Sequence, residues 1–159
     1  MPDENQKRFM QEAIDLSIEN VSRGNGGPFG AVVVKDGQII ARGCNQVTTK
    51  NDPTAHAEII AIKEACKKLD SFQLDNCILY TSCEPCPMCL GAIYWARPKK
   101  VFYACNRTDA AEIDFDDQFI YDEIQKSTKN RQIEFKNIMK QEGFNVFKNW
   151  KLKPNKIKY

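Results

Sequence analysis

The chain has 159 residues, a length typical of one compact domain that buries roughly two-thirds of the surface its unfolded form exposes. Hydrophobic residues make up 42% and charged residues 28%, values near the globular average, which argues against a disordered, fibrous or membrane-spanning protein. The formal net charge is +2, but five of the lysines lie in residues 148–159. The rest of the chain has 21 acidic and 18 basic residues, so it is acidic and attracts polyanions weakly.

The first part of the chain predicts a helix followed by a β-hairpin. Apolar residues recur at mostly helical spacing over residues 4–23, and the glycines and proline of residues 24–28 end this pattern. Two short β-prone runs follow at residues 31–34 and 39–41, joined by a turn with an Asp-Gly pair, which is a strong hairpin signal. We therefore expect one long helix and two antiparallel strands.

A second helix is expected after Asp52, which is suited to cap it, with Pro53 in the first helical position and an apolar pattern reaching Leu69. Strand and helix then alternate, with a strand, a helix and a strand expected at residues 77–81, 87–96 and 101–104. The remaining sequence predicts a short helix, a fifth strand and a terminal helical turn or two at residues 117–125, 133–135 and 144–150.

This order of elements predicts an α/β fold. We expect a three-layer α/β/α sandwich, in which helices cover the faces of a mixed five-stranded sheet whose later strands are parallel. Residues 1–159 are expected to form a single domain.

Seven cysteines give the clearest chemical signal in the sequence. Their number is odd and the chain begins without an apolar export signal, so we expect a cytoplasmic protein with reduced thiols and no membrane partner. Three of them, Cys83, Cys86 and Cys89, recur at every third residue. This spacing indicates metal or redox chemistry.

His56-Ala57-Glu58 and Pro85-Cys86-Pro87-Met88-Cys89 match the H-x-E and P-C-x-x-C signature of zinc nucleobase deaminases. Cys86 and Cys89 lie three residues apart near a helix start, so both thiolates can face one metal ion. His56 and Glu58 lie about 200° apart around a helix, so their side chains cannot face one point beside its middle. They can converge past the first turn, at the N-terminal end of the helix. We expect two helix N-termini to point at one Zn²⁺ held by His56, Cys86 and Cys89.

Three protein ligands leave a fourth position on the zinc for water or hydroxide. Zinc lowers the pKa of a bound water from about 15.7 towards about 7, and Glu58 is suited to accept the proton. The alternative is a structural zinc site in a non-enzymatic scaffold, with Cys83 as the fourth ligand. Cys83 fits better as the end of the preceding strand, and a structural site has no need of Glu58. The remaining cysteines lack ligand spacing and are expected in the core: Cys44, Cys66, Cys77 and Cys105.

Beyond the metal motifs, further segments resemble those of the small bacterial guanine deaminases, which have the cytidine deaminase-like fold. These segments lie at residues 29–31, 45, 51–58, 81–98, 108–111 and 115–117. The resemblance implies that His56, Cys86 and Cys89 hold Zn²⁺ and that Glu58 shuttles protons. It also implies that hydroxide on the zinc attacks C2 of guanine, which yields xanthine and ammonia.

The same resemblance implies contacts with the purine base. Asn45 pairs with the edge of the base, Phe29 stacks on it, the backbone amide of Ala57 donates a hydrogen bond, and Asp117 assists near the departing amine. These roles suit the chemistry, because an amide offers donor and acceptor together and a flat ring covers a flat ring. Without the resemblance, a capped turn at Asn45 and a core aromatic at Phe29 explain the residues equally well.

Members of that family are dimers whose C-terminal segments exchange between subunits. We therefore expect a homodimer in which residues 126–159 are exchanged. The resemblance further implies that Trp95 and Tyr159 help to close the pocket, so that either of them can act from the partner subunit.

A tRNA adenosine deaminase is the nearest alternative, because its metal motifs are nearly the same and its substrate also carries a purine. Such an enzyme needs a basic groove, whereas residues 108–125 contain seven acids and neither lysine nor arginine. We therefore expect a small purine base as the substrate and no nucleic-acid partner. A guanosine or cytosine deaminase is a further alternative.

Overall fold

The computed structural model describes residues 1–159, which divide into two compact units, residues 1–117 and residues 118–159. None of the helices combines the length and the apolar character of a membrane span. In the N-terminal unit the elements follow in the order α1 (Glu4–Ser22), β1 (Gly30–Lys35), β2 (Gln38–Cys44), α2 (Val47–Lys50), α3 (Ala57–Leu69), β3 (Ile78–Cys83), α4 (Pro87–Ala96), β4 (Lys100–Cys105) and α5 (Arg107–Ala111).

The predicted first helix and hairpin are confirmed. Helix α1 begins with a capping box, in which the Asp3 carboxylate accepts from the Gln6 backbone amide at 2.8 Å and the Gln6 side chain accepts from the Asp3 amide at 3.0 Å. Strands β1 and β2 pair in antiparallel fashion. Asp36 and Gly37 between them have φ values of 50° and 72°, the left-handed region that an Asp-Gly turn supplies.

The sheet is mixed and has four strands in the order β2-β1-β3-β4. Strand β3 pairs antiparallel with β1 and parallel with β4, so the later strands are parallel as expected. The expected fifth strand at residues 133–135 is wrong, because these residues lie outside every strand. Ile133 and Phe135 are exposed, and β propensity stabilises a strand only where the side chains pack on a sheet surface.

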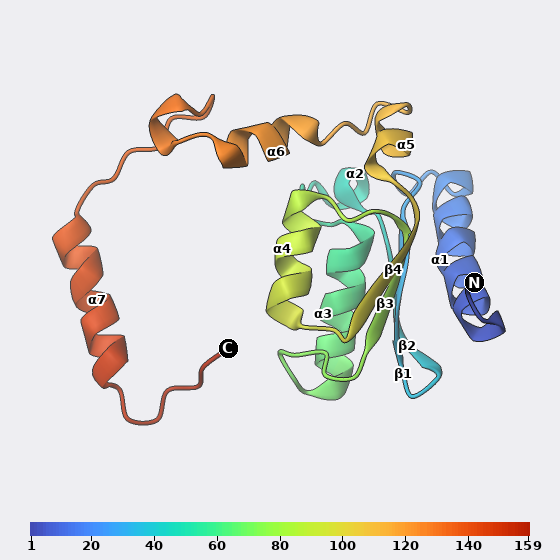
Figure 1. The fold of residues 1–159 in the computed structure, drawn as a ribbon, viewed down its shortest axis with the longest axis horizontal. Coiled ribbons are helices and arrows are strands. Elements are labelled where there is room, and N and C mark those ends of the chain that lie inside the picture. Colours follow the sequence, from blue (N-terminus) through green and yellow to red (C-terminus); the bar gives the residue numbers. More distant parts are fainter. The chain divides into compact units, whose positions relative to one another are not determined.

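Helices cover both faces of this sheet, which confirms the three-layer arrangement (Figure 1). Side chains alternate along β1: Val32 and Val34 pack with α1 residues in one apolar cluster, whereas Ala31 and Val33 pack with residues of α3 and α4 in the other. Strand β1 is therefore buried on both faces, and its position fixes α1 on one side and α3 and α4 on the other.

Helix α3 begins four residues later than expected. Asp52 does not cap it; its carboxylate instead accepts from the backbone amide of Thr54 at 2.8 Å and from the Thr54 hydroxyl at 2.6 Å, which closes a local turn. His56 has extended backbone angles and is the N-cap of the helix. This start sets His56 at the N-cap and Glu58 in the first turn of α3.

Gly43 on β2 allows α3 to approach the sheet closely. A Cβ atom at this position would overlap the carbonyl oxygen of Ala57 and lie 2.7 Å from the Ala61 nitrogen, and neither backbone atom can rotate away. We expect Gly43→Ala to destabilise the protein by about 1–3 kcal/mol or more, the usual cost of overpacking, and to lower its zinc content. Thermal unfolding and metal analysis measure both effects.

Gly91→Ala is the matched control, because a Cβ atom at Gly91 on α4 meets nothing within 4 Å. This variant should gain roughly 0.5–1 kcal/mol from the higher helix propensity of alanine. Equal unfolding temperatures for the two variants would contradict the close approach of α3 to Gly43.

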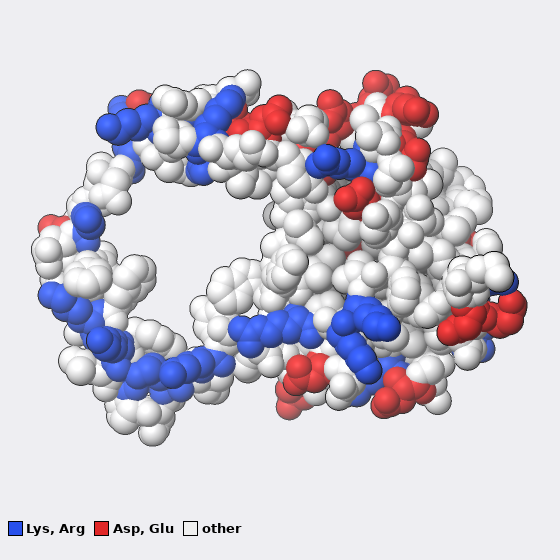
Figure 2. Space-filling model, in the orientation of Figure 1, with Lys and Arg blue, Asp and Glu red and all other residues white.

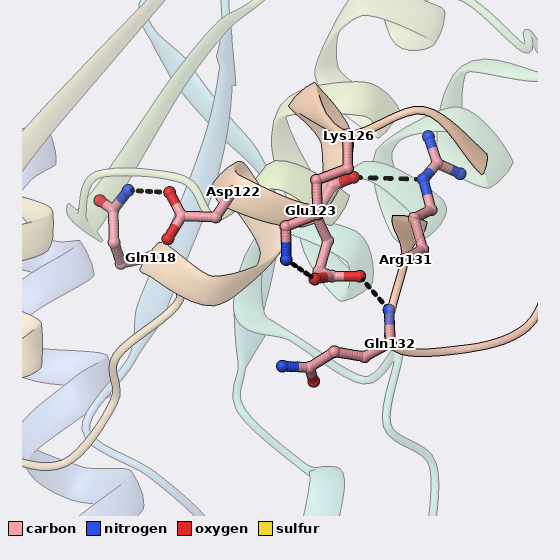
Figure 3. A network of polar contacts seen from close by, with 6 residues as sticks. All are labelled: Gln118, Asp122, Glu123, Lys126, Arg131 and Gln132. Atoms are coloured by element: carbon pink, nitrogen blue, oxygen red, sulfur yellow. Dashed lines mark hydrogen bonds and ion pairs between the residues drawn. The ribbon is translucent and has the colours of Figure 1, made fainter. Parts of the chain in front are cut away.

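The C-terminal unit contains α6 (Gln118–Gln125), the 3₁₀ helix η1 (Thr128–Asn130) and α7 (Lys140–Leu152), and none of its residues is buried. The short helix expected at residues 117–125 is confirmed, and the expected helical turn at 144–150 is part of the longer α7. Glu123 ties the end of α6 to the chain beyond η1: its carboxylate accepts from Lys126 Nζ at 2.6 Å and from the Gln132 backbone amide at 2.8 Å (Figure 3). Arg131 donates to the Glu123 carbonyl at 3.1 Å.

Candidate metal centre and substrate site

Two helix starts bring the predicted metal ligands together. His56 is the N-cap of α3 and Cys86 is the N-cap of α4, and neither side chain is used for a capping hydrogen bond. Cys89 lies in the first turn of α4. The Nδ1 atom of His56 is 3.5 Å from the Sγ atom of Cys86 and 3.5 Å from that of Cys89, and the three ligand atoms all lie within 4.8 Å of one another.

These spacings fit a zinc ion. Zinc–sulfur bonds of about 2.3 Å and zinc–nitrogen bonds of about 2.0 Å, at the tetrahedral angle, place a sulfur and a nitrogen about 3.5 Å apart. The observed 3.5 Å separations agree with this value for both cysteines. The donor set of one imidazole and two thiols is also one that zinc favours.

The electrostatics of the three side chains favour a negative charge on Cys86. Hydrogen bonds, first from Cys89 and then from His56, lower the pKa of the Cys86 thiol to about 4. The same contact with Cys86, together with burial, raises the pKa of Cys89, and the hydrogen bond to Cys86 raises the pKa of His56. A thiolate is therefore stable here, and the partial positive charge of the α3 and α4 N-termini favours it further.

Glu58 lies beside the three ligands in the first turn of α3. Its side chain is only 6% exposed, and its Oε2 atom accepts from the Cys89 thiol at 3.5 Å. Burial is the main cause that raises the pKa of this carboxyl group. Glu58 is not one of the residues whose ligand atoms cluster, so its position suits proton transfer beside the metal better than metal binding.

Cys83 is not part of the ligand cluster. It ends β3, as expected, and its thiol lies 3.8 Å from the Asn106 carbonyl oxygen, while burial raises its pKa to about 12. Of the cysteines expected in the core, Cys77 is buried, Cys44 and Cys66 are half-buried, and Cys105 is exposed. The expectation for Cys105 is wrong because β4 is an edge strand of the sheet and Cys105 is its last residue.

Two of the expected substrate residues are joined through their backbones. Phe29 precedes β1 and Asn45 follows β2, and the Asn45 amide donates to the Phe29 carbonyl at 3.1 Å. The Asn45 side chain is buried, and its Oδ1 atom accepts from the backbone amides of Gly27 and Val47, each at 3.3 Å. The Phe29 ring meets the edge of Phe115, with ring centroids 4.9 Å apart.

The other expected substrate residues differ in how deeply they are buried. Ala57 is fully buried between His56 and Glu58 at the start of α3. Asp117 is half-buried, and its pKa is raised first by burial and then by the negative charge of Cys86, so it lies within electrostatic reach of the ligands. Trp95 on α4 is 62% exposed, and Tyr159 in the C-terminal unit is 69% exposed. The chain does not itself bury either ring.

One buried polar residue near this site was not predicted from the sequence. Asn20 on α1 is 3% exposed and bonds to the backbones of Gly27 and Asn45. A signal was present, because Asn20 continues the helical spacing of the buried residues Phe9, Ala13 and Ser17, and an asparagine on such a face needs internal partners.

Residues 3–105 match the model of the family described as the cytidine and deoxycytidylate deaminase zinc-binding region. The chain belongs to this deaminase family. The matched residues include all three ligands and Glu58 of the deaminase, and they end with β4.

One relative spans nearly the full length of this deaminase. Guanine deaminase of Bacillus subtilis is 60% identical over 155 residues, which cover 98% of this chain and 99% of that protein. The X-ray structure of guanine deaminase from Bacillus subtilis superposes with a TM-score of 0.94 and covers 96% of this chain and 98% of that one. The tRNA-specific adenosine deaminase of Aquifex aeolicus matches a shorter segment. It is 48% identical over 77 residues, which cover 48% of this chain and 51% of that protein.

Proposed function

We propose that this protein is a zinc-dependent guanine deaminase, which hydrolyses guanine to xanthine and ammonia. The observation that carries the proposal is the 60% identity with a guanine deaminase over 98% of the chain. The clustering of His56, Cys86 and Cys89 beside a buried Glu58 supports it, because hydrolytic deamination needs these groups together. All seven cysteines are free of disulfide bonds, which is the usual arrangement in cytoplasmic proteins and supports a place in the cytoplasm.

The side chains then divide the work of the reaction. His56, Cys86 and Cys89 would hold the zinc ion, which would supply an acidified water when bound. Glu58 accepts a proton from that water and donates a proton to the amino group that leaves from C2, so one carboxyl group serves both steps. Its burial beside Cys89 excludes solvent from the transfer and holds the carboxyl group in place.

The base is held by groups whose remaining hydrogen-bonding capacity fits a purine. Because Oδ1 of Asn45 is engaged by two backbone amides, Nδ2 is the atom left to donate to an acceptor on the base. The Ala57 amide lies in the first turn of α3, where backbone N–H groups have no partner within the helix. Phe29 stacks on the ring, and Asp117 assists near the departing amine.

The protein acts as a homodimer in which residues 126–159 exchange between subunits, so that Trp95 or Tyr159 closes the pocket in trans. Exposed apolar side chains support this part of the proposal, because a second copy of the chain would cover them. Helix α4 exposes Leu90, Tyr94 and Trp95. The C-terminal unit exposes large apolar side chains at Phe119, Ile124, Ile133, Phe135, Ile138, Met139, Phe144, Val146, Phe147, Trp150, Leu152, Ile157 and Tyr159.

A tRNA substrate is the second candidate, and one observation favours it. Figure 2 shows lysine and arginine side chains along α7, where a polyanion would find positive charge. Acidic side chains gather over α5, which follows directly on the matched family region. The acids disfavour a nucleic acid beside the metal centre, so guanine remains the better supported substrate.

A panel of substrates tests the proposal directly. Ammonia release is measured with guanine, guanosine, adenine, cytosine and a tRNA anticodon stem-loop. We expect guanine to give the highest kcat/KM. Faster ammonia release from guanosine or from the stem-loop would identify that compound as the substrate in place of guanine. If none of the five compounds released ammonia, the proposed deaminase activity would be wrong.

Truncation after Lys153 tests the role of the chain end. Because Tyr159 would close the pocket and no residue of this tail is buried, we expect roughly a tenfold or larger loss of kcat/KM with a small change in unfolding temperature. Lys158→Ala keeps the full length and Tyr159, and serves as the control. Unchanged kinetics in the truncated protein would show that the tail is only a solvated end.

A further inference from the structure

Asn20 lies in the last turn of α1 and is almost fully buried, with 3% of its surface exposed. Its side-chain nitrogen donates two hydrogen bonds, one to the carbonyl of Gly27 at 2.9 Å and one to the carbonyl of Asn45 at 2.9 Å. Both N–H bonds of the side-chain amide are thus used. Asn20 joins the loop after α1 to the end of β2, two segments that are far apart in the sequence.

These segments carry the two proposed contacts with the base. The Gly27 amide donates to Oδ1 of Asn45 at 3.3 Å, and the Asn45 amide donates to the Phe29 carbonyl at 3.1 Å. A Cβ atom at Gly26 would overlap the Asn45 carbonyl oxygen, so the loop backbone lies directly against residue 45. Asn20 therefore closes a ring of hydrogen bonds that contains the backbone of Asn45 and the approach to Phe29.

We propose that Asn20 is a positioning residue for base recognition, which sets the orientation of Asn45 and Phe29 through their backbones. This inference rests on the proposed function. Asn45 can offer the base only its Nδ2 donor, and the direction of that donor depends on where the residue 45 backbone and the Gly27 amide are held. A fixed donor loses little conformational entropy when the base binds, whereas a mobile donor must first be ordered.

The physical cost of losing Asn20 falls on the two carbonyl groups. The buried Asn45 carbonyl would lose its donor, and the part-buried Gly27 carbonyl would keep only the 2.8 Å hydrogen bond from the Phe29 amide, so the backbone would move to find another partner or water. Movement of the Gly27 segment tilts the Asn45 amide and shifts Phe29. The metal ligands lie on α3 and α4, outside this ring of hydrogen bonds, so they keep their positions.

The kinetic test uses Asn20→Ala, with Asn20→Ser as a second variant in which the hydroxyl can replace one of the two donated bonds. We expect Asn20→Ala to lower kcat/KM for guanine roughly tenfold, mostly through a higher KM, because it weakens ground-state and transition-state binding alike. Asn20→Ser should show a smaller loss. Zinc content should equal that of the wild type in both variants, and assays are run well below their unfolding temperatures.

Ser17→Ala is the matched control. Ser17 lies one turn earlier on the same buried face of α1, and its hydroxyl donates only to Ile14 within the helix. This change should leave the KM for guanine within about twofold of the wild type, since it touches no group in the ring of hydrogen bonds. A rise in KM as large as that of Asn20→Ala would overturn the inference, because general loosening of α1 would then explain the effect.

A double-mutant cycle with Asn45→Ala separates positioning from stability. If Asn20 acts through Asn45, Asn20→Ala should cost less in kcat/KM once Asn45 is already alanine than its roughly tenfold cost in the wild type, because only its effect through Phe29 remains. A full, additive loss in that background would refute the inference, as would an Asn20→Ala enzyme with unchanged KM. A wild type that does not deaminate guanine would instead refute the proposed function, so the two failures are distinguishable.

Discussion

Glu58→Gln should lose about 10²–10⁴-fold in kcat, the usual contribution of a positioned proton-transfer group, while it keeps its zinc and its fold. Glutamine has nearly the same shape as glutamate, so it fits the buried position of Glu58, which is 6% exposed. Its amide can still contact the Cys89 thiol. It cannot take a proton from water or pass one to the departing amine. Ammonia release, metal analysis and thermal unfolding measure the three quantities separately.

Glu64→Gln is the control for this experiment, because Glu64 is an exposed residue further along the same helix. Its kcat should equal that of the wild type. Near-normal turnover in Glu58→Gln would remove the carboxyl group from the mechanism, and loss of zinc in that variant would show that Glu58 supports the metal site rather than the proton transfer.

Cys86→Ser should lose both zinc and turnover, and its unfolding temperature should fall. Cys86 is the N-cap of α4 and carries the thiol with the lowered pKa, so it is the side chain that binds a cation without first having to lose a proton at neutral pH. Metal binding contributes to folding stability, because the ligand cluster exists only in the folded chain. Removal of zinc from the wild type by a chelator should reproduce the loss of activity, and added zinc should restore it.

Cys83→Ala is the matched control, since this nearby cysteine is buried outside the ligand cluster. It should retain one zinc per chain. Replacement of zinc by cobalt adds a spectroscopic test, in which two thiolates and one imidazole are expected with an exchangeable fourth ligand. Four protein donors around the metal, or loss of metal in Cys83→Ala, would favour a structural site and contradict hydrolysis.

The sequence predicted the centre of the molecule well because local patterns and long-range packing agree there. Burial of β1 on both faces follows from its run of small and branched apolar residues, and the Asp-Gly pair fixes the hairpin. The spacing of the two metal motifs also sufficed, because His56 and Cys86 each directly precede a helix, and two helix starts beside one sheet edge bring their side chains together.

The errors arose where a local signal competes with a partner elsewhere in the structure. Asp52 has the residue type and the following proline of an N-cap, yet Thr54 satisfies its carboxylate and α3 starts later. Ile133 and Phe135 have the propensity of a strand but no sheet surface to pack on. The contacts of Asn20 depend on three segments meeting in space, which no spacing rule encodes. The roles of Trp95 and Tyr159 stay predictions, because a second subunit would have to supply their surroundings.

The way Asn45 is held has a consequence for the end of the catalytic cycle. Its oxygen is engaged inside the protein, so the base recognition that we propose for this residue reduces to one donated hydrogen bond. The oxygen on C6 and the imidazole nitrogens of guanine are the same atoms in xanthine, and hydrolysis at C2 leaves them untouched. An anchor of this kind retains the product as firmly as the substrate, so xanthine should compete with guanine, and departure from the pocket depends on what has changed at C2.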